Sequence, residues 1–320
     1  MKLEQVNGLG GEPERMHLEP VLASPQQQDE RWTGKFSEPS SSRTVIPAGQ
    51  PVVAFKPDGT LLATVVRQQL SKDAMASAFS VLRKYSARTD LRGKATGLES
   101  QFESHSKTGK LSKTSRLNRR VHEMPISGVM GYFDRYVRIP YCRKCSYNRD
   151  NPQEFAKTVP LYQEMDRVYR ATLPERHAGQ LAAIEATHPD WRIADTVFTT
   201  ITVNRNWRTA YHRDAGDLIA PGQGVSCLVA LWGGEATGGN LVLPAWDLEV
   251  ELRSGDMILM DSHEIHGNTP IVGIPGKYHR VSVVAYYRTA MQECGSSDDE
   301  FARAKTINTE RADRRRRGEL

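Results

Sequence analysis

The sequence predicts an α+β protein whose core is a double-stranded β-helix, or jelly roll, of antiparallel strands braced by helices that precede it in the chain. Two observations predict this fold. From about residue 153 to 187, apolar residues recur at helical spacing, and prolines divide the segment into two or three helices. After "HPDW" (188–191) the pattern changes to seven strand-like runs in fewer than 100 residues, separated by turns rich in glycine, aspartate and asparagine.

The two ends of the 320-residue chain have the composition of segments without a core. Residues 1–45 are rich in proline, glutamine and serine and lack hydrophobic periodicity, so we expect a disordered N-terminal arm. Residues 295–320 are charged throughout and predict at most a solvated helix. The domain between them, 46–294, then divides into a supporting part (46–190) and the jelly-roll core (191–294).

The supporting part begins with a predicted hairpin. In "PVVAFKPDGTLLATVV" (51–66), Asp58-Gly59 provides the backbone freedom of a tight turn between two apolar runs. Ser71 is then positioned to cap an amphipathic helix. The segment 88–120 is polar and basic and contains glycine, serine and threonine, which indicates a long loop.

The jelly-roll core is predicted from runs of β-branched and aromatic residues. In a jelly roll, strands far apart in sequence can lie side by side, so residues of different runs can share one site. The seven runs are, in order, DTVFTTITVN, WRTAYH, GVSCLVALW, GNLVLPAW, LEVEL, DMILMD and HRVSVVAYYR.

Composition limits the class of protein. No apolar run approaches the roughly 18 residues of a membrane helix, and the N-terminus has no secretory apolar region. We therefore expect an intracellular, cytoplasmic protein that is not secreted and has no membrane partner. Lysine and arginine exceed aspartate and glutamate by 43 to 38, an excess too small to indicate a partner.

The four cysteines do not indicate a disulfide scaffold, and an intracellular chain would keep them reduced, so we expect no disulfide partner. Cys142 and Cys145 are close together in "YCRKCSYN", but a zinc site needs four ligands. Cys227 lies inside an apolar run and Cys294 follows the last one. Packing cysteines are the favoured interpretation, and zinc is the alternative.

One segment has the charge pattern of a phosphate binder. "HSKTGKLSKTSRLNRR" (105–120) holds six lysines and arginines and no acid, and "RRRR" follows at 314–317. An extended chain with a cation at every third position can follow a nucleic-acid backbone, although a solvated loop is the alternative. The candidate DNA contacts at that spacing are Lys107, Lys110, Lys113, Arg116 and Arg119.

"WRTAYHRDAGD" (207–217) places His212 and Asp214 two residues apart after a predicted strand. A His-Arg-Asp sequence also occurs in the catalytic loop of kinases. That interpretation fails because Ile219 stands where the kinase loop needs asparagine, and the chain has neither a glycine-rich phosphate loop nor "DFG". A metal-binding pair and a surface turn remain.

A second histidine cluster favours the metal. "MDSHEIHGNTP", with His263 and His266, follows about fifty residues later at the end of another predicted strand. Two neutral imidazoles and one carboxylate on one face of a metal form the triad of non-haem Fe(II) oxygenases. Such a site leaves coordination positions for a cosubstrate and for O₂.

Oxygenases that use 2-oxoglutarate also need a cation for the far carboxylate of that cosubstrate. Arg280, fourteen residues past His266, is the candidate because its planar guanidinium can bind a carboxylate with two hydrogen bonds. Side chains alternate across a strand, so Ser282 shares the face of Arg280 and can add a hydroxyl. His279 should point to the opposite face.

Four segments, "TTITVNRNWRTAYHRDAGD", "GGNLVLPAW", "GDMILMDSHEIHGNTP" and "HRVSVVAYY", together resemble the TET/JBP dioxygenases. This family includes thymine hydroxylases of the J-binding-protein type and TET 5-methylcytosine hydroxylases. The resemblance covers roughly residues 46–290 and is strongest to the J-binding-protein, phage and bacterial members, which implies a bacterial or bacterial-host cytoplasm. The cysteine-rich zinc region of animal TET proteins has no counterpart beyond the Cys142/Cys145 pair.

The resemblance implies a cofactor set and its ligands. Fe(II) would be held by His212, Asp214 and His266, with His263 as the alternative third ligand. 2-Oxoglutarate would be held by Arg280 with help from Ser282, and O₂ would be the second cosubstrate.

The implied activity is hydroxylation of the 5-methyl group of thymine or 5-methylcytosine in DNA. A methyl group on a stacked base cannot reach a buried iron, so the target base must be flipped out of the duplex. Asn206 and Arg208 are candidate contacts to this substrate, with strand packing as the alternative for both. Two other functions stay open: an oxygenase acting on RNA, protein or a small molecule, and a catalytically inactive jelly roll that binds DNA.

Overall fold

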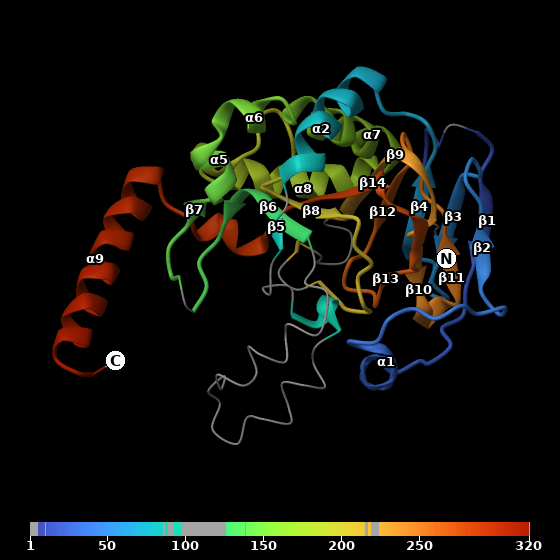
Figure 1. The fold of residues 1–320 in the computed structure, drawn as a ribbon, viewed down its shortest axis with the longest axis horizontal. Helices are drawn as coiled ribbons and strands as arrows, with labels where there is room; N and C mark the ends of the chain where they lie inside the picture. Colours follow the sequence, from blue (N-terminus) through green and yellow to red (C-terminus); the bar gives the residue numbers. More distant parts are fainter. Residues whose placement is uncertain are drawn as a thin grey trace.

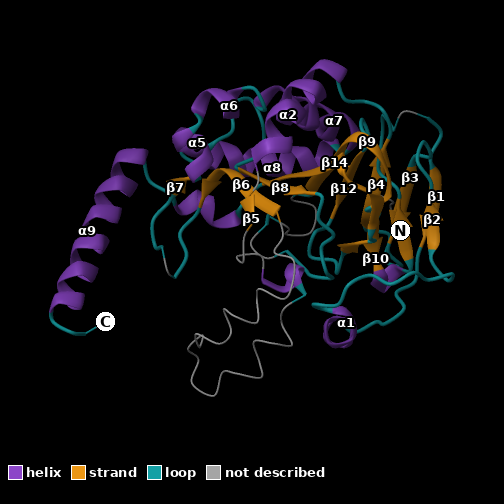
Figure 2. Cartoon of the chain, in the orientation of Figure 1, coloured by secondary structure: helices purple, strands orange, loops and turns teal. Residues whose placement is uncertain are grey.

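The computed structural model describes residues 6–9, 11–85, 87–88, 93–97, 126–137, 139–214, 217–218 and 224–319. Two β-sheets face one another, and helices cover the outer face of the larger sheet (Figure 1). Figure 2 shows the same layers by type of element, with α2, α5, α6, α7 and α8 above the strands. The predicted α+β jelly roll is therefore confirmed.

Three sets of elements build these layers. The larger sheet contains β1 (Glu14–His17), β3 (Val52–Phe55), β4 (Leu61–Val66), β5 (Ala87–Arg88), β6 (Ile126–Phe133), β7 (Arg143–Lys144), β8 (Thr200–Arg205), β9 (Ser226–Gly238), β12 (Met257–Met260) and β14 (Ile271–Tyr286). The smaller sheet contains β2 (Thr44–Ile46), β10 (Leu241–Leu243), β11 (Leu248–Val250) and β13 (Gly267–Asn268). The α-helices are α1 (Pro25–Trp32), α2 (Lys72–Tyr85), α5 (Ser146–Asp150), α6 (Pro152–Ala156), α7 (Val159–Thr172), α8 (Pro174–Ala186) and α9 (Ser297–Arg316), and short 3₁₀ helices include η1 (Gly93–Thr96) and η4 (Thr289–Glu293).

The strands of the larger sheet are not in chain order. Their order is β1-β3-β4-β12-β9-β14-β8-β6-β5, with β7 paired to β6, and the smaller sheet runs β13-β10-β11-β2. The centre of the larger sheet is therefore β9, β14 and β8, which are antiparallel neighbours. This order brings residues near 204, 230 and 282 together, as expected for a jelly roll.

Alternation along the central strands separates an apolar face from a polar one. On β14, Val281 and Val283 are buried under the helices together with Tyr162 of α7. Ser282 and Val284 point the other way, into the space between the sheets, where they line a cavity. The helices thus bury the outer face of the sheet, and the inner face is left to form a site.

The supporting elements follow the prediction from sequence. β3 and β4 form the predicted hairpin, and Gly59 adopts a positive φ of 81° in its turn. The amphipathic helix predicted after Ser71 is α2, and α6, α7 and α8 correspond to the proline-divided helices.

The prediction of a disordered N-terminal arm is wrong for the part of it that the structure describes. β1 pairs in parallel with β3, and β2 pairs in parallel with β11. The composition of the arm indicates disorder because the arm has no hydrophobic core of its own. It is ordered because its strands pair with strands of the jelly roll. The side chain of Arg213 donates to Asp29 at 2.7 Å and to Gln28 at 2.7 Å, and Gln28 is only 5% exposed.

The run WRTAYH, predicted as a strand, is not one. Residues 206–211 instead cross between two distant segments and bond to both. The amide of Ala210 donates to the carbonyl of Ala95, and the amide of Tyr211 donates to the carbonyl of Lys35. The segment has the composition of a strand, but its backbone forms isolated hydrogen bonds to these segments and no continuous β-ladder.

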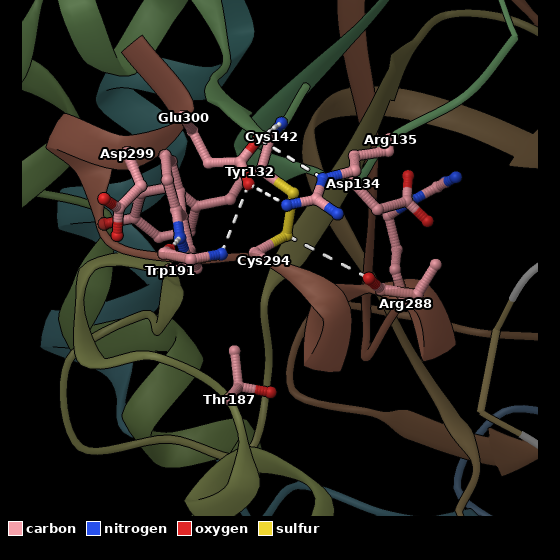
Figure 3. Close-up of a disulfide and its surroundings, with 12 residues drawn as sticks. Tyr132, Asp134, Arg135, Cys142, Thr187, Trp191, Arg288, Cys294, Asp299 and Glu300 are labelled. Atoms are coloured by element: carbon pink, nitrogen blue, oxygen red, sulfur yellow. Dashed lines mark hydrogen bonds and ion pairs between the residues drawn. A yellow bond between two sulfur atoms is a disulfide. The ribbon is translucent and has the colours of Figure 1, made fainter. Parts of the chain in front are cut away.

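The expectation of reduced, unpaired cysteines is also wrong. Cys142, just before β7, forms a disulfide with Cys294, just after η4, and their Cα atoms are 5.9 Å apart (Figure 3). Their separation of 152 positions in the sequence hides this pairing from any local spacing argument. Cys145 and Cys227 are free and buried, and burial raises the pKa of the Cys145 thiol to about 12. Among the described residues, no metal-ligating cluster includes a cysteine, so the zinc alternative gains no support.

The charged tail forms α9, which extends away from the body of the molecule (Figure 1). A capping box between Ser296 and Asp299 begins the helix. Glu300 anchors its first turn, because it accepts hydrogen bonds from the amides of Cys142 and Gly295 and pairs with Arg135 (Figure 3).

Within the described ranges, none of the helices combines the length and apolar content that a membrane span requires.

Candidate functional site

His212, Asp214 and His266 come together between the two sheets. Their potential ligand atoms all lie within 4.8 Å of one another. The Nε2 of His212 is 3.5 Å from Oδ1 of Asp214, and the Nε2 of His266 is 3.8 Å from Oδ2 of the same carboxylate. This is the arrangement of two imidazoles and one carboxylate that the sequence predicts.

The backbone fixes the two histidines relative to each other. His212 and His266 exchange both amide-to-carbonyl hydrogen bonds at 2.9 Å, and the amide of Asp214 donates to the carbonyl of Ser262 at 3.0 Å. The segment around Asp214 is thereby attached to the turn between β12 and β13. His212 and Asp214 are thus held beside His266, more than fifty residues later in the chain, by main-chain bonds before any metal is considered.

Each imidazole is oriented by a second hydrogen bond. The Nδ1 of His212 is 2.8 Å from the carbonyl of Ala210, and the Nδ1 of His266 is 2.9 Å from the carbonyl of Glu264. A carbonyl only accepts, so both Nδ1 atoms carry the proton and donate it. Both Nε2 atoms are then unprotonated and face Asp214, as metal-ligating histidines require.

His263 lies outside this cluster. Its side chain is 43% exposed, and its ring is 3.4 Å from the carboxylate of Asp261. Its carbonyl accepts a hydrogen bond from Arg213 at 2.5 Å, so its backbone helps to dock the N-terminal arm. Of the two histidines in "DSHEIHGN", the structure places only His266 with His212 and Asp214.

The cluster lines a cavity of about 210 Å³ between the sheets. The inner faces of the central strands supply its wall, so the alternation described for β14 also builds the pocket. The wall residues include Thr202, Asn204, Leu228, Ser282 and Val284.

Arg280 lies beside Ser282 and is only 2% exposed. One of its terminal nitrogens donates to the carbonyl of Gly239 at 2.5 Å, and its guanidinium lies 5.6 Å from the ring centre of Trp232. Its Nε is buried without a hydrogen-bond partner, and no acid in the described part of the chain forms an ion pair with it. A buried cation without an anion is costly, so this residue fits an anionic ligand.

The surroundings of Arg280 hold it in one position. Burial and the nearby positive charge of Arg253 lower its pKa to about 10, so it stays protonated at neutral pH. Gly239 has a positive φ of 63°, and a Cβ there would lie 2.5 Å from Nε of Arg280. The amide of Arg280 donates to Oδ1 of Asn206 at 2.7 Å. His279 points to the opposite face, as strand alternation predicts, and packs edge-on against Phe79 of α2.

The other end of the cavity contains residues that sequence reasoning did not select. Asp217 accepts hydrogen bonds from the hydroxyls of Ser226 and Ser262, each at 2.9 Å. Burial, followed by the charge of Asp214, raises the pKa of Asp217 to about 7. Arg288 also lines the cavity and pairs with Asp134 at 2.8 Å. Continuing the alternation from Arg280 along β14 would have pointed to Arg288.

The candidate substrate contacts are placed elsewhere. Asn206 has a positive φ of 47° and bonds to the backbone of Arg280 and Tyr278, so it supports β14. The guanidinium of Arg208 lies 4.4 Å from the ring centre of Phe36. Both residues line a second cavity beside the first. Lys107, Lys110, Lys113, Arg116 and Arg119 lie outside the described residues.

Comparison with known proteins agrees with the resemblance seen in the motifs. Residues 128–289 match the Tet_JBP family model, the oxygenase domain of the 2OGFeDO superfamily. The bifunctional helicase and thymine dioxygenase JBP2 of Leishmania infantum is 37% identical over 187 residues, which cover 58% of this chain and 16% of that protein. The thymine dioxygenase JBP1 of Leishmania tarentolae is 32% identical over 244 residues, covering 74% of this chain and 26% of that protein.

The chain therefore spans only about a sixth to a quarter of the length of these relatives. Among solved structures, NgTET1 in complex with 5mC DNA superposes with a TM-score of 0.53 at 12% identity, covering 84% of this chain and 88% of that one. At this identity the likeness concerns the fold alone. Together with the family match, it confirms the resemblance drawn from the motifs: the chain belongs to the Tet_JBP family of oxygenase domains in the 2OGFeDO superfamily.

Proposed function

We propose that the protein is an Fe(II)- and 2-oxoglutarate-dependent dioxygenase that hydroxylates the 5-methyl group of a pyrimidine in DNA. The observation that carries the proposal is the cluster of His212, Asp214 and His266 in one cavity. Ser282 lines the same cavity two residues from Arg280, which is buried and forms no ion pair with an acid of the described residues. Thymine is the first candidate base, because the relatives that are similar in sequence are named thymine dioxygenases. 5-Methylcytosine is the second.

The donor set suits ferrous iron. Two neutral imidazoles and a carboxylate on one side of a metal are the ligands of non-haem Fe(II) oxygenases. With 2-oxoglutarate and O₂ bound, iron supplies an oxidant able to remove hydrogen from a methyl group, and succinate and CO₂ are released. His212 and His266 serve this chemistry by presenting deprotonated Nε2 atoms, while their Nδ1 protons stay on backbone carbonyls.

Arg280 and Ser282 would hold the far carboxylate of 2-oxoglutarate. The partnerless Nε of Arg280 supplies a donor, and a carboxylate beside it would neutralise the buried charge. The hydroxyl of Ser282 lies on the same face of β14 and is 3.4 Å from the side-chain amide of Asn204. Asn206 keeps the backbone of Arg280 in register by accepting from its amide.

The end of the cavity with Asp217 and Arg288 is left for the substrate. A carboxyl group and a guanidinium offer an acceptor and donors, which can pair with the edge of a pyrimidine ring. A base reaches this depth only if it leaves the duplex, at a cost of a few kcal/mol. Asp217 is held for this role by two serine hydroxyls.

The test is mass spectrometry of nucleosides from duplex DNA incubated with the protein, Fe(II), 2-oxoglutarate and O₂. Duplexes whose only 5-methylpyrimidine is thymine are compared with duplexes that carry 5-methylcytosine. We expect 5-hydroxymethyluracil from the first and none from Asp214→Ala. Turnover only with RNA, a peptide or free thymidine would assign another substrate, and absence of succinate under all conditions would leave a DNA-binding domain without activity.

A further inference from the structure

A second cavity, of about 350 Å³, lies beside the first. Its walls include Phe36, Trp207, Arg208 and Tyr278. Trp207 also lines the cavity that holds the histidines and Asp214. The two cavities therefore share one aromatic side chain, and we call the second one the aromatic groove.

The aromatic groove is built from segments that the fold fixes in place. The backbone of 206–211 is bonded to Lys35 and Ala95, as described above. Gly97, with a positive φ of 73°, lies under the ring of Phe36, and a Cβ there would be 2.7 Å from that ring. On the opposite wall, the carbonyl of Tyr278 accepts from the side chain of Asn206. These contacts hold the side chains of the aromatic groove in position.

Its side chains have the chemistry of a stacking site. The guanidinium of Arg208 covers the ring of Phe36 at 4.4 Å, and the rings of Phe36 and Trp207 meet edge to face at 6.4 Å. None of the three rings belongs to the two buried cores, and all are half-buried. Arg208 forms no ion pair within the described ranges. Aromatic rings and an arginine plane left partly open are the features on which nucleobases stack.

We infer that the aromatic groove binds the nucleobase next to the flipped pyrimidine. This inference rests on the proposed function, because it takes the target base to occupy the cavity beside Trp207. Flipping a base removes the stacking partner of its neighbour. A neighbour that lies on Trp207, Arg208 and Tyr278 regains a stacking surface, and Trp207, which lines both cavities, places that surface next to the target.

The test is a thermodynamic cycle between protein and DNA. The full chain with Fe(II) and 2-oxoglutarate is kept anaerobic, and its affinity for a labelled duplex with one target thymine is measured by fluorescence anisotropy. The protein is the parent or Arg208→Gln. The duplex is intact, or it lacks the base 5′ of the target, the base 3′ of the target, or the base opposite it.

We expect Arg208→Gln to weaken binding to the intact duplex about ten-fold, the size of one base-stacking contribution. On the duplex that lacks one of the two neighbouring bases, the same substitution should cost almost nothing, because its partner is already gone. Tyr278→Leu, on the opposite wall, should also weaken binding to the intact duplex and have almost no effect on the duplex that lacks the same base.

Arg149→Gln and Phe301→Leu are the matched controls, since both side chains are exposed and belong to helices away from the groove. They should leave all four affinities unchanged. Equal losses on every duplex would overturn the inference, because Arg208 would then contact the backbone only. Coupling confined to the base opposite the target would also overturn it. Since binding is measured without turnover, failure to find a hydroxylated product contradicts the proposed function and leaves this result intact.

Discussion

At the residue scale, His212 and His266 stand in different local sequences, but their imidazoles are held by the same kind of hydrogen bond. Each donates its Nδ1 proton to the carbonyl two residues before it. His263, three residues before His266, has no such bond and points to Asp261. The backbone therefore directs the imidazole of His266 into the cluster and that of His263 away from it.

This difference predicts opposite outcomes for the two histidines. His266→Ala should abolish succinate formation, because it removes one of three protein ligands, whereas His263→Ala should keep measurable activity. Iron content after anaerobic loading provides a second measurement. An active His266→Ala variant together with an inactive His263→Ala variant would move the third ligand to His263.

Arg280 gives a prediction about the cosubstrate. Arg280→Ala should raise the concentration of 2-oxoglutarate needed for half-maximal turnover by roughly 30-fold or more, since a hydrogen bond to a charged group contributes about 2 kcal/mol or more. Titration of 2-oxoglutarate against succinate formation measures it. Arg303→Gln, an exposed arginine on α9, is the control. Normal cosubstrate affinity in Arg280→Ala would give the role to another cation, Arg288 first.

The residues of the site were predictable where a short motif carries the chemistry. His212, Asp214 and Arg280 stand in such motifs, and strand alternation adds Ser282. Asp217 was not selected, because a turn aspartate has no distinctive local pattern. For Arg288 the signal was the alternation from Arg280, which continues two residues past the end of β14. Their role in the cavity arises from the pairing of Asp217 with Arg288 across the fold.

At the element scale, the hairpin, α2, α7 and α8 could be predicted, because the spacing of apolar residues within each segment indicates a strand or a helix. The crossing segment 206–211 could not, since its backbone partners, Lys35 and Ala95, are supplied by distant chain segments. The disulfide is another case of this kind, because it joins β7 to the end of η4 and so fixes the base of α9.

The disulfide should stabilise the fold because its cysteines are separated by 152 positions in the sequence. A closed loop of this size restricts the unfolded chain by about 5 kcal/mol in the chain-entropy model. We expect reduction, or the Cys294→Ser substitution, to lower the free energy of unfolding in urea by up to that amount. Cys227→Ala, which alters a buried free cysteine and keeps the disulfide, is the comparison: its stability should fall with reductant as that of the parent does, whereas Cys294→Ser should not respond to reductant. Equal stability with and without reductant would show that the pair is open in solution.

The basic segment 105–120 remains a prediction. Replacing Lys107, Lys110, Lys113, Arg116 and Arg119 with serine should weaken DNA binding for all sequences. Each lost phosphate contact should lower the slope of log K against log salt by about 0.9. Decarboxylation of 2-oxoglutarate without DNA should stay unchanged. Parental affinity from low to moderate salt would direct the search to Arg314, Arg315, Arg316 and Arg317.

At the scale of the whole molecule, the N-terminal arm supports the segment that carries His212. β2 pairs with β11, and the carbonyl of Lys35 accepts from the amide of Tyr211, next to His212. Removal of residues 1–46 should therefore reduce iron binding and turnover strongly. Removal of 1–5 alone is the control. A truncated protein with parental iron affinity would mean that the arm is dispensable in solution.

The same long-range bonds govern how the protein folds. The bonds that support residues 206–212 come from the segments around Lys35, Ala95 and His266, so the site is complete only when all three are in place. Contacts between residues so far apart form slowly, because the chain loses loop entropy before the contacts stabilise it. On a ribosome, the iron site would be completed only after β13 has emerged and β14 has joined the centre of the sheet. Iron would thus be acquired after synthesis of the core rather than during it, and cells short of iron would accumulate a folded apoprotein.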